Sequence, residues 1–218
     1  MEIYWLKNST FLIKTLLGKR ILIDPFNLFN TFNNIYNPDI ICFSKDLDNS
    51  NSADTIDKSI KVISNNEDFS SYDIKIKSYC SYSDNLYGLK RGKNYIHVFE
   101  IDGYKLCHLG YLGEIPNNEM INIFTDMDFL FLPIGGNVCI DGSDAYRLCK
   151  LLNPNYIIPM CYKCSNDDFY YSNAKDFFTY NDNKTIVSKE NILDTTSLSL
   201  MSKCTVIIFN MLSFKNCY

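Results

Sequence analysis

Short apolar runs separated by turn residues fill most of the chain. Runs rich in Ile, Phe, Tyr and Thr that end at Gly, Pro, Asn or Asp are typical of β-strands. Asp102-Gly103 is a pair that closes a tight two-residue hairpin. The pattern predicts strands over residues 3–6, 10–13, 20–24, 39–43, 73–79, 95–101, 104–109, 128–133, 155–159 and 204–209.

Helical signals are fewer and lie mostly in the second half. Asp141 is placed to cap a helix over residues 143–152, with Asp144 in its first turn. A weaker helix is predicted over residues 174–178, and the periodic stretch 53–63 is compatible with another. No repeat, linker or low-complexity block divides the sequence. We therefore predict one α/β domain over residues 1–218, built of stacked layers.

Composition narrows the class of partner. The 218 residues carry 21 Lys+Arg against 25 Asp+Glu, a formal charge of −4, and no basic run. This balance argues against a nucleic-acid or anionic-membrane partner. No apolar run approaches the ~20 residues of a membrane span, and the first residues do not form a secretory signal. We predict a cytoplasmic protein whose nine scattered cysteines are mostly small buried side chains.

The chain contains only two histidines, His97 and His108. Histidine is the commonest metal ligand and the commonest general base near neutral pH, so this count excludes a site built from several histidines. His97 alternates with Tyr95 and Phe99 along a predicted strand, and we interpret it as a packed sheet residue. His108 is also interpreted as structural, although its position makes it a candidate binding residue.

Several segments, taken in order, resemble the metallo-β-lactamase superfamily. They are Trp5-Leu-Lys-Asn-Ser-Thr-Phe-Leu-Ile13, Lys19-Arg-Ile-Leu-Ile-Asp-Pro25, Asn37-Pro-Asp-Ile-Ile41, Arg91-Gly-Lys-Asn94, Asp102-Gly103, Cys107-His-Leu-Gly110, Leu132-Pro-Ile-Gly-Gly136, Leu152-Asn-Pro154 and Ile158-Pro-Met160. The set runs to about residue 164 and is most similar to the branch of ascorbate-6-phosphate lactonase-like Zn-dependent hydrolases. The resemblance implies a four-layer αββα sandwich with a dinuclear metal site at one edge of its two sheets.

The same resemblance implies where metal ligands should stand, and in this chain each position holds another residue. The family loop His-x-His-x-Asp-His would follow the strand that ends at Phe43, where residues 44–50 read Ser-Lys-Asp-Leu-Asp-Asn-Ser. Later family ligands lie in Tyr-His-Asp, His-Leu-Gly-Asp and Pro-Met-His-Tyr settings. The substituted positions are Lys45, Leu47, Asn49, Ser50, Ser83, Tyr111 and Cys161, and Lys45, Leu47, Tyr111 and Cys161 are expected to share one pocket.

A kept scaffold without its ligands predicts a pseudoenzyme, with no catalytic residue, no metal and no cofactor. Its role would be to bind a small anionic ligand or a protein partner, and a homo-oligomer is compatible with the sequence. The candidate binding residues are Asp46, Asp48, Asp84, Arg91, Lys93 and His108. Basic side chains suit an anion such as phosphate, although a solvated turn explains Arg91 and Lys93 equally well.

Two alternatives remain open at this level. The chain could be a metal-dependent hydrolase of a lactone or phosphoester that holds Zn or Mn on Asp46, Asp48, Asp84 and Cys161. A shift of one residue re-aims a side chain, which argues against this set. Cys161 and Cys164 form a Cys-x-x-Cys pair that could support thiol chemistry, but no second pair exists to complete a zinc site.

Overall fold

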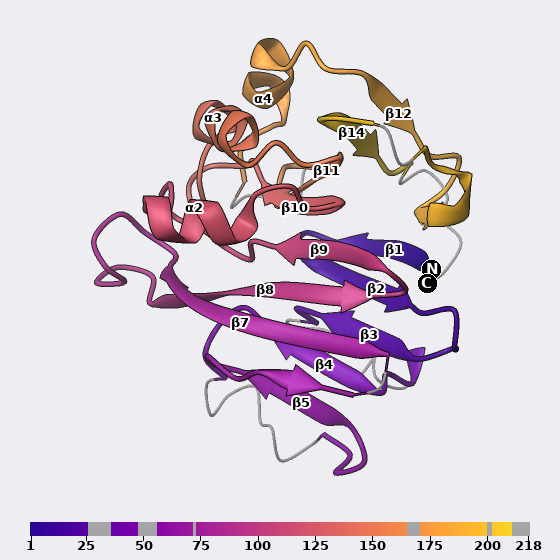
Figure 1. The fold of residues 1–218 in the computed structure, drawn as a ribbon. Coiled ribbons are helices and arrows are strands. Elements are labelled where there is room, and N and C mark those ends of the chain that lie inside the picture. Colours follow the sequence, from indigo (N-terminus) through magenta and orange to yellow (C-terminus); the bar gives the residue numbers. More distant parts are fainter. Residues whose placement is uncertain (26–35, 48–55, 72, 165–170, 200–201, 211–218) are drawn as a thin grey trace.

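The structure of the protein, a computed structural model, is shown in Figure 1. It describes residues 1–25, 36–47, 56–71, 73–164, 171–199 and 202–210. Two β-sheets lie face to face. The first has the strand order β13-β1-β2-β3-β4-β5, and the second has the order β12-β14-β11-β10-β9-β8-β7-β6. The strands of the first sheet are β1 (Glu2–Lys7), β2 (Thr10–Lys14), β3 (Arg20–Ile23), β4 (Ile40–Phe43), β5 (Lys61–Ser64) and β13 (Ile192–Asp194).

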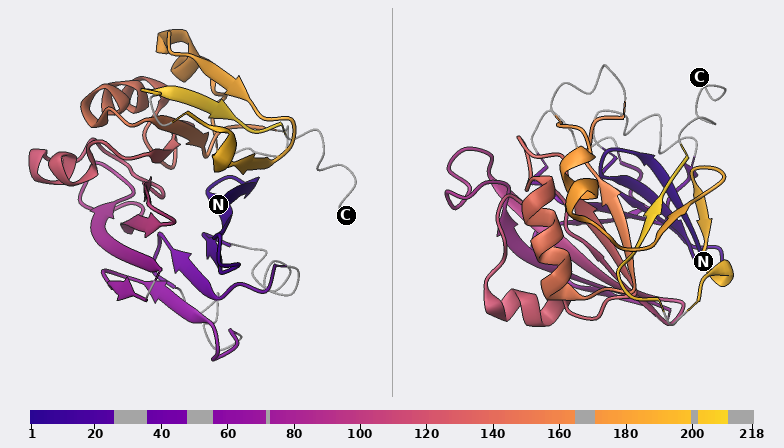
Figure 2. Two further views of the ribbon diagram at one scale, coloured as in Figure 1. Left: turned by 45° about the vertical axis from the view of Figure 1, so that its right-hand side comes forward. Right: turned by 90° about the horizontal axis from the view of Figure 1, so that it is seen from above.

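The second sheet is longer and carries the helices. Its strands are β6 (Phe69–Ser70), β7 (Ile74–Tyr82), β8 (Lys93–Ile101), β9 (Tyr104–His108), β10 (Phe129–Pro133), β11 (Tyr156–Met160), β12 (Thr185–Val187) and β14 (Thr205–Ile208). Three helices cover its outer face, α2 (Asn118–Phe124), α3 (Gly142–Leu152) and α4 (Lys175–Tyr180), as the two views of Figure 2 show. None of the helices in the described ranges is long and apolar enough to cross a bilayer.

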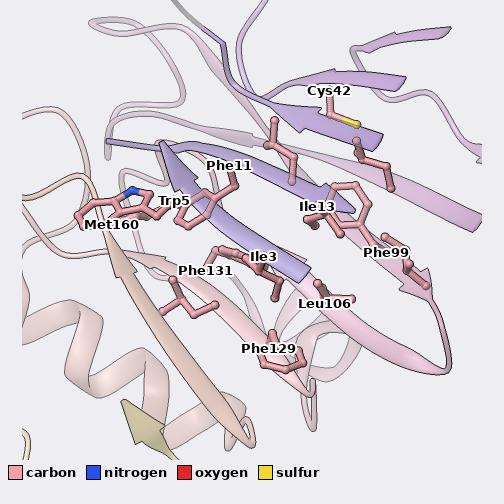
Figure 3. Packing of buried hydrophobic residues seen from close by; sticks show 14 of the residues in the cluster. Ile3, Trp5, Phe11, Ile13, Cys42, Phe99, Leu106, Phe129, Phe131 and Met160 are labelled. Atoms are coloured by element: carbon pink, nitrogen blue, oxygen red, sulfur yellow. The ribbon is translucent and has the colours of Figure 1, made fainter. Parts of the chain in front are cut away.

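Strand alternation places the core between the sheets. Trp5 and Phe11 of the first sheet point inward and belong to one buried cluster with Phe99 and Phe131 of the second (Figure 3). The rings of Phe11 and Phe131 lie 4.7 Å apart in an edge-to-face contact. The intervening residues of the first sheet point outward and form a separate apolar cluster of Leu6, Leu12, Leu22, Ile41 and Phe43.

The α/β fold class is confirmed, and the local signals explain why. Asp102 and Gly103 both adopt positive φ, 53° and 82°, in the tight turn between β8 and β9. Asp141 caps α3 by accepting a hydrogen bond from the Asp144 N–H at 2.9 Å. Each strand predicted from the sequence is present, with shifted ends.

The helix considered over residues 53–63 is wrong where the structure describes it. Residues 61–64 form β5, which pairs in parallel with β4, and residues 53–55 lie outside the described ranges. Only Ile63 of this edge strand is buried, so the sequence carries no period-two alternation. Helix α2 and the short strands β6, β12 and β13 were not predicted.

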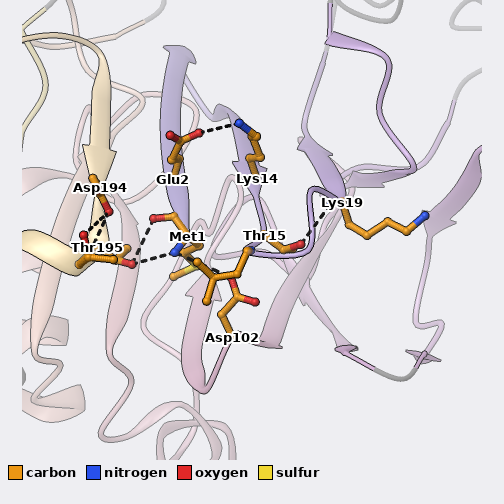
Figure 4. Close-up of polar contacts among 10 residues, drawn as sticks. Met1, Glu2, Lys14, Thr15, Lys19, Asp102, Asp194 and Thr195 are labelled. Carbon is orange, nitrogen blue, oxygen red and sulfur yellow. Dashed lines mark hydrogen bonds and ion pairs between the residues drawn. The ribbon is translucent and has the colours of Figure 1, made fainter.

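Polar contacts join β1 to β13 at one end of the first sheet (Figure 4). The Met1 amino group donates to Thr195 Oγ1 at 3.1 Å, and the Thr195 N–H donates to Met1 O at 3.1 Å. Asp102, from the second sheet, accepts a hydrogen bond from the Leu16 N–H at 2.8 Å. The Asp102 contact links the two sheets at that end.

Candidate functional site

Loops that follow neighbouring strands gather at one edge of the sandwich. Asp24 follows β3, Lys45 follows β4, Tyr111 follows β9 and Cys161 follows β11. The strand pairs β3–β4, β9–β10 and β10–β11 are parallel, so their carboxyl ends point to the same edge. This edge is where a fold of this kind can build a site.

Asp24 lies at the centre of the edge, and the sequence analysis did not identify it. Its side chain is fully buried, and Oδ1 accepts a hydrogen bond from the Ser44 N–H at 2.6 Å. Its Oδ2 has no hydrogen-bond partner among the residues that the structure describes. Burial raises the pKa of Asp24 to about 7, against the lowering effect of the Ser44 hydrogen bonds and of the Lys45 charge. Ser9 also lies beside this carboxyl group.

Lys45 brings a positive charge to the same edge. Its Nζ donates to Arg91 O at 2.9 Å and lies 5.4 Å from the centre of the Tyr111 ring, a cation–π contact. The Tyr111 hydroxyl accepts a hydrogen bond from Ser9 Oγ at 2.8 Å. Burial raises the pKa of Tyr111 well above its usual value, so this phenol stays neutral.

Cys161 closes the edge from β11. The residue is fully buried and has a φ of 54°, and its N–H donates to Asn8 O at 3.3 Å. Gly135 packs against it so closely that a Cβ there would lie 1.8 Å from Cys161 O. Burial, with the nearby Cys139 and Asp24 groups, raises the pKa of the Cys161 thiol well above its usual range. An uncharged, enclosed thiol is a poor nucleophile.

Cys161 is therefore expected to resist alkylation by iodoacetamide in the native protein at neutral pH. Cys80 and Cys164 are exposed and serve as internal controls that should react. Peptide mass mapping after a timed reaction would give the rate at each position, and Cys161 should react only after denaturation. Native labelling of Cys161 at the rate of Cys164 would instead favour thiol chemistry.

Asp84 organises the loop between β7 and β8. The carboxylate is fully buried and accepts four backbone hydrogen bonds, from Leu86 and Gly88 to Oδ1 and from Lys90 and Arg91 to Oδ2, at 2.7–3.0 Å. Burial alone would raise its pKa, but these donors lower the pKa of Asp84 overall. Both oxygens are thus occupied by the loop itself.

The neighbours of Asp84 hold the same loop. Ser83 is buried, and its carbonyl oxygen accepts a hydrogen bond from Arg91 Nε at 2.9 Å. Arg91 Nη1 also donates to Asn137 O. Lys93 is exposed and opens β8 opposite Tyr82. Arg91 lies beside Lys45, whose Nζ donates to its carbonyl oxygen, and Lys93 lies at the base of the loop.

The residues predicted from the motif loop divide between two faces of the first sheet. Asp46 is exposed and accepts a hydrogen bond from the Tyr95 hydroxyl at 2.7 Å. Leu47 packs against the outward apolar cluster that contains Phe43. It therefore does not join Lys45 and Tyr111, which lie on the core side. Asp48, Asn49 and Ser50 lie outside the described residues.

Both histidines are buried and connect the two sheets. In the assigned tautomers, His97 Nε2 donates to Phe43 O and His108 Nε2 donates to Ser9 O, each at 3.0 Å. His108 Nδ1 accepts from the Gly110 N–H at 3.3 Å. Burial lowers the pKa of His97 to about 4 and of His108, which also faces His97, to about 3. Both rings are neutral at physiological pH.

Chemically, this edge offers the cations Lys45 and Arg91, the buried carboxyl group of Asp24 and several hydroxyl groups. Within the described ranges, no group of three or more His, Cys, Asp or Glu side chains gathers as a metal site. Lys45 uses one of its three N–H donors on Arg91 O, which leaves donor capacity for an anion. Tyr171, which the sequence analysis missed, lies beside both Tyr111 and Cys161.

Comparisons with known proteins agree with this architecture. A chain from Thermotoga maritima, assigned as a Zn-dependent hydrolase of the metallo-β-lactamase superfamily, superposes with a TM-score of 0.72 at 27% identity, over 96% of this chain and 99% of that one. A metallo hydrolase from Ignicoccus hospitalis gives a TM-score of 0.59 at 18% identity, over 81% and 88% of the two chains, which supports the fold alone.

Sequence relatives and the family model point the same way. UPF0173 metal-dependent hydrolases match at 38% identity over 65 residues in Pelotomaculum thermopropionicum and at 30% over 90 residues in Thermococcus onnurineus. These matches cover 30% and 41% of this chain, and only 28% and 39% of those relatives. The model of the beta-lactamase superfamily domain matches residues 2–161. This chain therefore belongs to the metallo-β-lactamase superfamily.

Proposed function

We propose that this protein is a metallo-β-lactamase-fold pseudoenzyme, which has lost the dinuclear metal centre and acts by binding a small anionic ligand or a protein partner. We place it, as a single domain of residues 1–218 in the cytoplasm, near the ascorbate-6-phosphate lactonase-like branch. The observation that carries this proposal is the contact between Lys45 and Tyr111. An ammonium group seated over a neutral phenol replaces the imidazole and carboxylate that a metal pair would require.

The residues present at the edge do not fit two divalent cations. Lys45 would repel them, and it has no lone pair to offer while it is protonated. Tyr111 remains neutral and already accepts a hydrogen bond from Ser9, and a neutral phenol is a poor ligand for a hard metal. Cys161 is enclosed and its thiol is protonated, whereas metal binding needs the thiolate.

The names of the relatives favour the alternative, a metal-dependent hydrolase with atypical ligands. The contacts of the described candidates weigh against it. Both carboxylate oxygens of Asp84 accept hydrogen bonds from the backbone of its own loop. Asp46 is exposed and accepts a hydrogen bond from the Tyr95 hydroxyl. Among the described residues, neither carboxylate forms with Cys161 a group of three or more side chains that could hold a metal ion. Asp48 lies outside the described residues and leaves the set incomplete.

An anion fits the same edge better than a cation does. Lys45 donates to the backbone oxygen of Arg91, whose exposed guanidinium acts electrostatically on Lys45, and the two positive charges together favour a carboxylate or phosphate group. Ser9 and Tyr111 supply hydroxyl groups nearby that can orient an oxygen-rich ligand. A phosphorylated or carboxylated small molecule is the ligand class that this chemistry selects.

Metal analysis tests the pseudoenzyme proposal directly. After purification and dialysis without chelator, inductively coupled plasma mass spectrometry should find Zn, Mn and Fe far below one ion per chain. The Thermotoga maritima relative, prepared in the same way, is the control for metal loss during handling. Stoichiometric metal that survives dialysis in this chain would overturn the proposal and favour the hydrolase. Native mass spectrometry of the same sample would reveal a co-purified anion.

A further inference from the structure

The loop between β7 and β8 exposes an apolar tip. In this 84–93 loop, Leu86, Tyr87 and Leu89 are exposed by 39%, 78% and 85%. Three large apolar side chains are therefore exposed within four positions of one loop, and exposed apolar surface that gathers in one place often marks an interaction site. Figure 1 shows the connection between β7 and β8 extending beyond the body of the fold.

The 84–93 loop is held in shape from inside. The four backbone donors bound by Asp84 span Leu86 to Arg91, so the carboxylate fixes the whole tip. Gly113 lies against its base, where a Cβ would come within 2.2 Å of Asp84 N. A surface fixed in advance loses little conformational entropy on binding. The apolar tip is therefore suited to a specific partner.

Positive charge surrounds the tip. Lys90, Arg91 and Lys93 are exposed, and Lys45 donates to Arg91 O beside them. The only carboxylate of the 84–93 loop, Asp84, is buried within it. The chain as a whole carries −4. The exposed part of this loop is thus basic and apolar, although the protein as a whole is acidic. It is complementary to a partner surface that is apolar and negatively charged.

We propose that the 84–93 loop docks into an apolar pocket of a partner protein whose rim carries carboxylates. Tyr87 and Leu89 would fill the pocket, and Lys90 and Lys93 would face the rim. A membrane is disfavoured because each basic residue near anionic lipid contributes only about 1 kcal/mol, and the acidic remainder of the chain would be repelled. This inference does not depend on whether the neighbouring edge holds a metal.

A peptide library displayed on phage, selected against the full-length chain, provides a defined probe. Enriched peptides should combine aromatic or aliphatic residues with Asp or Glu, and the affinity of synthetic copies should fall as salt rises. Tyr87→Ser/Leu89→Ser should weaken binding by about tenfold or more. Lys90→Glu/Lys93→Glu should also weaken it. The matched control is Leu16→Ser/Leu17→Ser, at positions exposed by 71% and 70%, which should change nothing.

The other outcomes overturn the docking assignment. Selected peptides that lack carboxylates, or that bind the Tyr87→Ser/Leu89→Ser variant equally well, would contradict it. Loop-dependent binding to vesicles of phosphatidylcholine and phosphatidylserine would assign the tip to a membrane. Loop-dependent dimers in sedimentation velocity would assign it to a second copy. The substituted side chains are exposed, so an unchanged melting temperature shows that each variant is folded.

Discussion

Replacing Asp84 by alanine is expected to destabilise the protein by at least about 3 kcal/mol. The substitution leaves four inward-facing backbone N–H groups without their acceptor. Hydrogen bonds to a charged group contribute about 1.5–3 kcal/mol each, and water can replace only some of them after the loop opens. Urea unfolding followed by circular dichroism would measure the loss.

Asp84→Asn separates hydrogen bonding from charge. The amide oxygen can keep two donors, but its NH2 group would face the other two, so a large loss is expected here as well. Asp46→Ala is the matched control, because Asp46 is exposed and accepts one hydrogen bond from Tyr95. Its effect should stay below about 1 kcal/mol. A loss equally small for Asp84→Ala would show that the carboxylate does not hold the loop.

Lowering the pH from about 6.5 to 4 is expected to weaken the fold by several kcal/mol through His97 and His108. Both rings are neutral when folded, with pKa values of about 4 and 3, whereas the unfolded chain takes up protons below the ordinary value of 6.5. Their stabilising contribution is therefore complete above pH 6.5 and is lost as pH falls. Each pKa unit corresponds to about 1.4 kcal/mol.

Asp24 opposes this trend over much of the same range. Its folded pKa of about 7 exceeds the ordinary 3.8, so the folded state binds the extra proton, and this contribution is lost as pH rises toward 7. The two histidines outweigh one carboxyl group below about pH 6.5, so the net slope from these three groups is positive there. Urea midpoints measured from pH 4.5 to 8 would give that slope.

Glutamine variants test the assignment to each histidine. In His97→Gln, the side-chain amide can still donate to Phe43 O, and in His108→Gln it can donate to Ser9 O, but neither titrates. Each variant should be less stable at pH 7 and should lose stability less steeply on acidification. An unchanged slope in both variants would mean that other groups take up the protons.

The fold could be predicted wherever local chemistry and burial agreed. The Asp102-Gly103 turn and the Asp141 cap are dictated by backbone conformation and a single hydrogen bond, so the sequence is enough. Strand β5 was misread because its place at the sheet edge buries only Ile63. Helix α2 was missed because the one fully buried residue there is Phe124, too little for a helical period.

The candidate site was less accessible to sequence reasoning. Lys45 and Tyr111 could be matched to motif positions, and the family model covers both. Asp24 belongs to no spacing that signals chemistry, since its burial arises only when the ends of β3 and β4 meet. Tyr171 reaches the edge from outside the matched residues. Leu47 shows the opposite error, because it lies beyond the end of β4 and packs with the outer-face cluster instead of with Lys45 and Tyr111.

The pairing of β1 with β13 also sets an order of events during synthesis. Asn191 Nδ2 donates to Trp5 O across a separation of 186 residues. This side of β1 therefore stays unpaired until β13 has left the ribosome. Contacts this distant along the sequence slow folding, and an unpaired edge invites aggregation. Expression should consequently respond strongly to temperature and to chaperones that shield nascent strands.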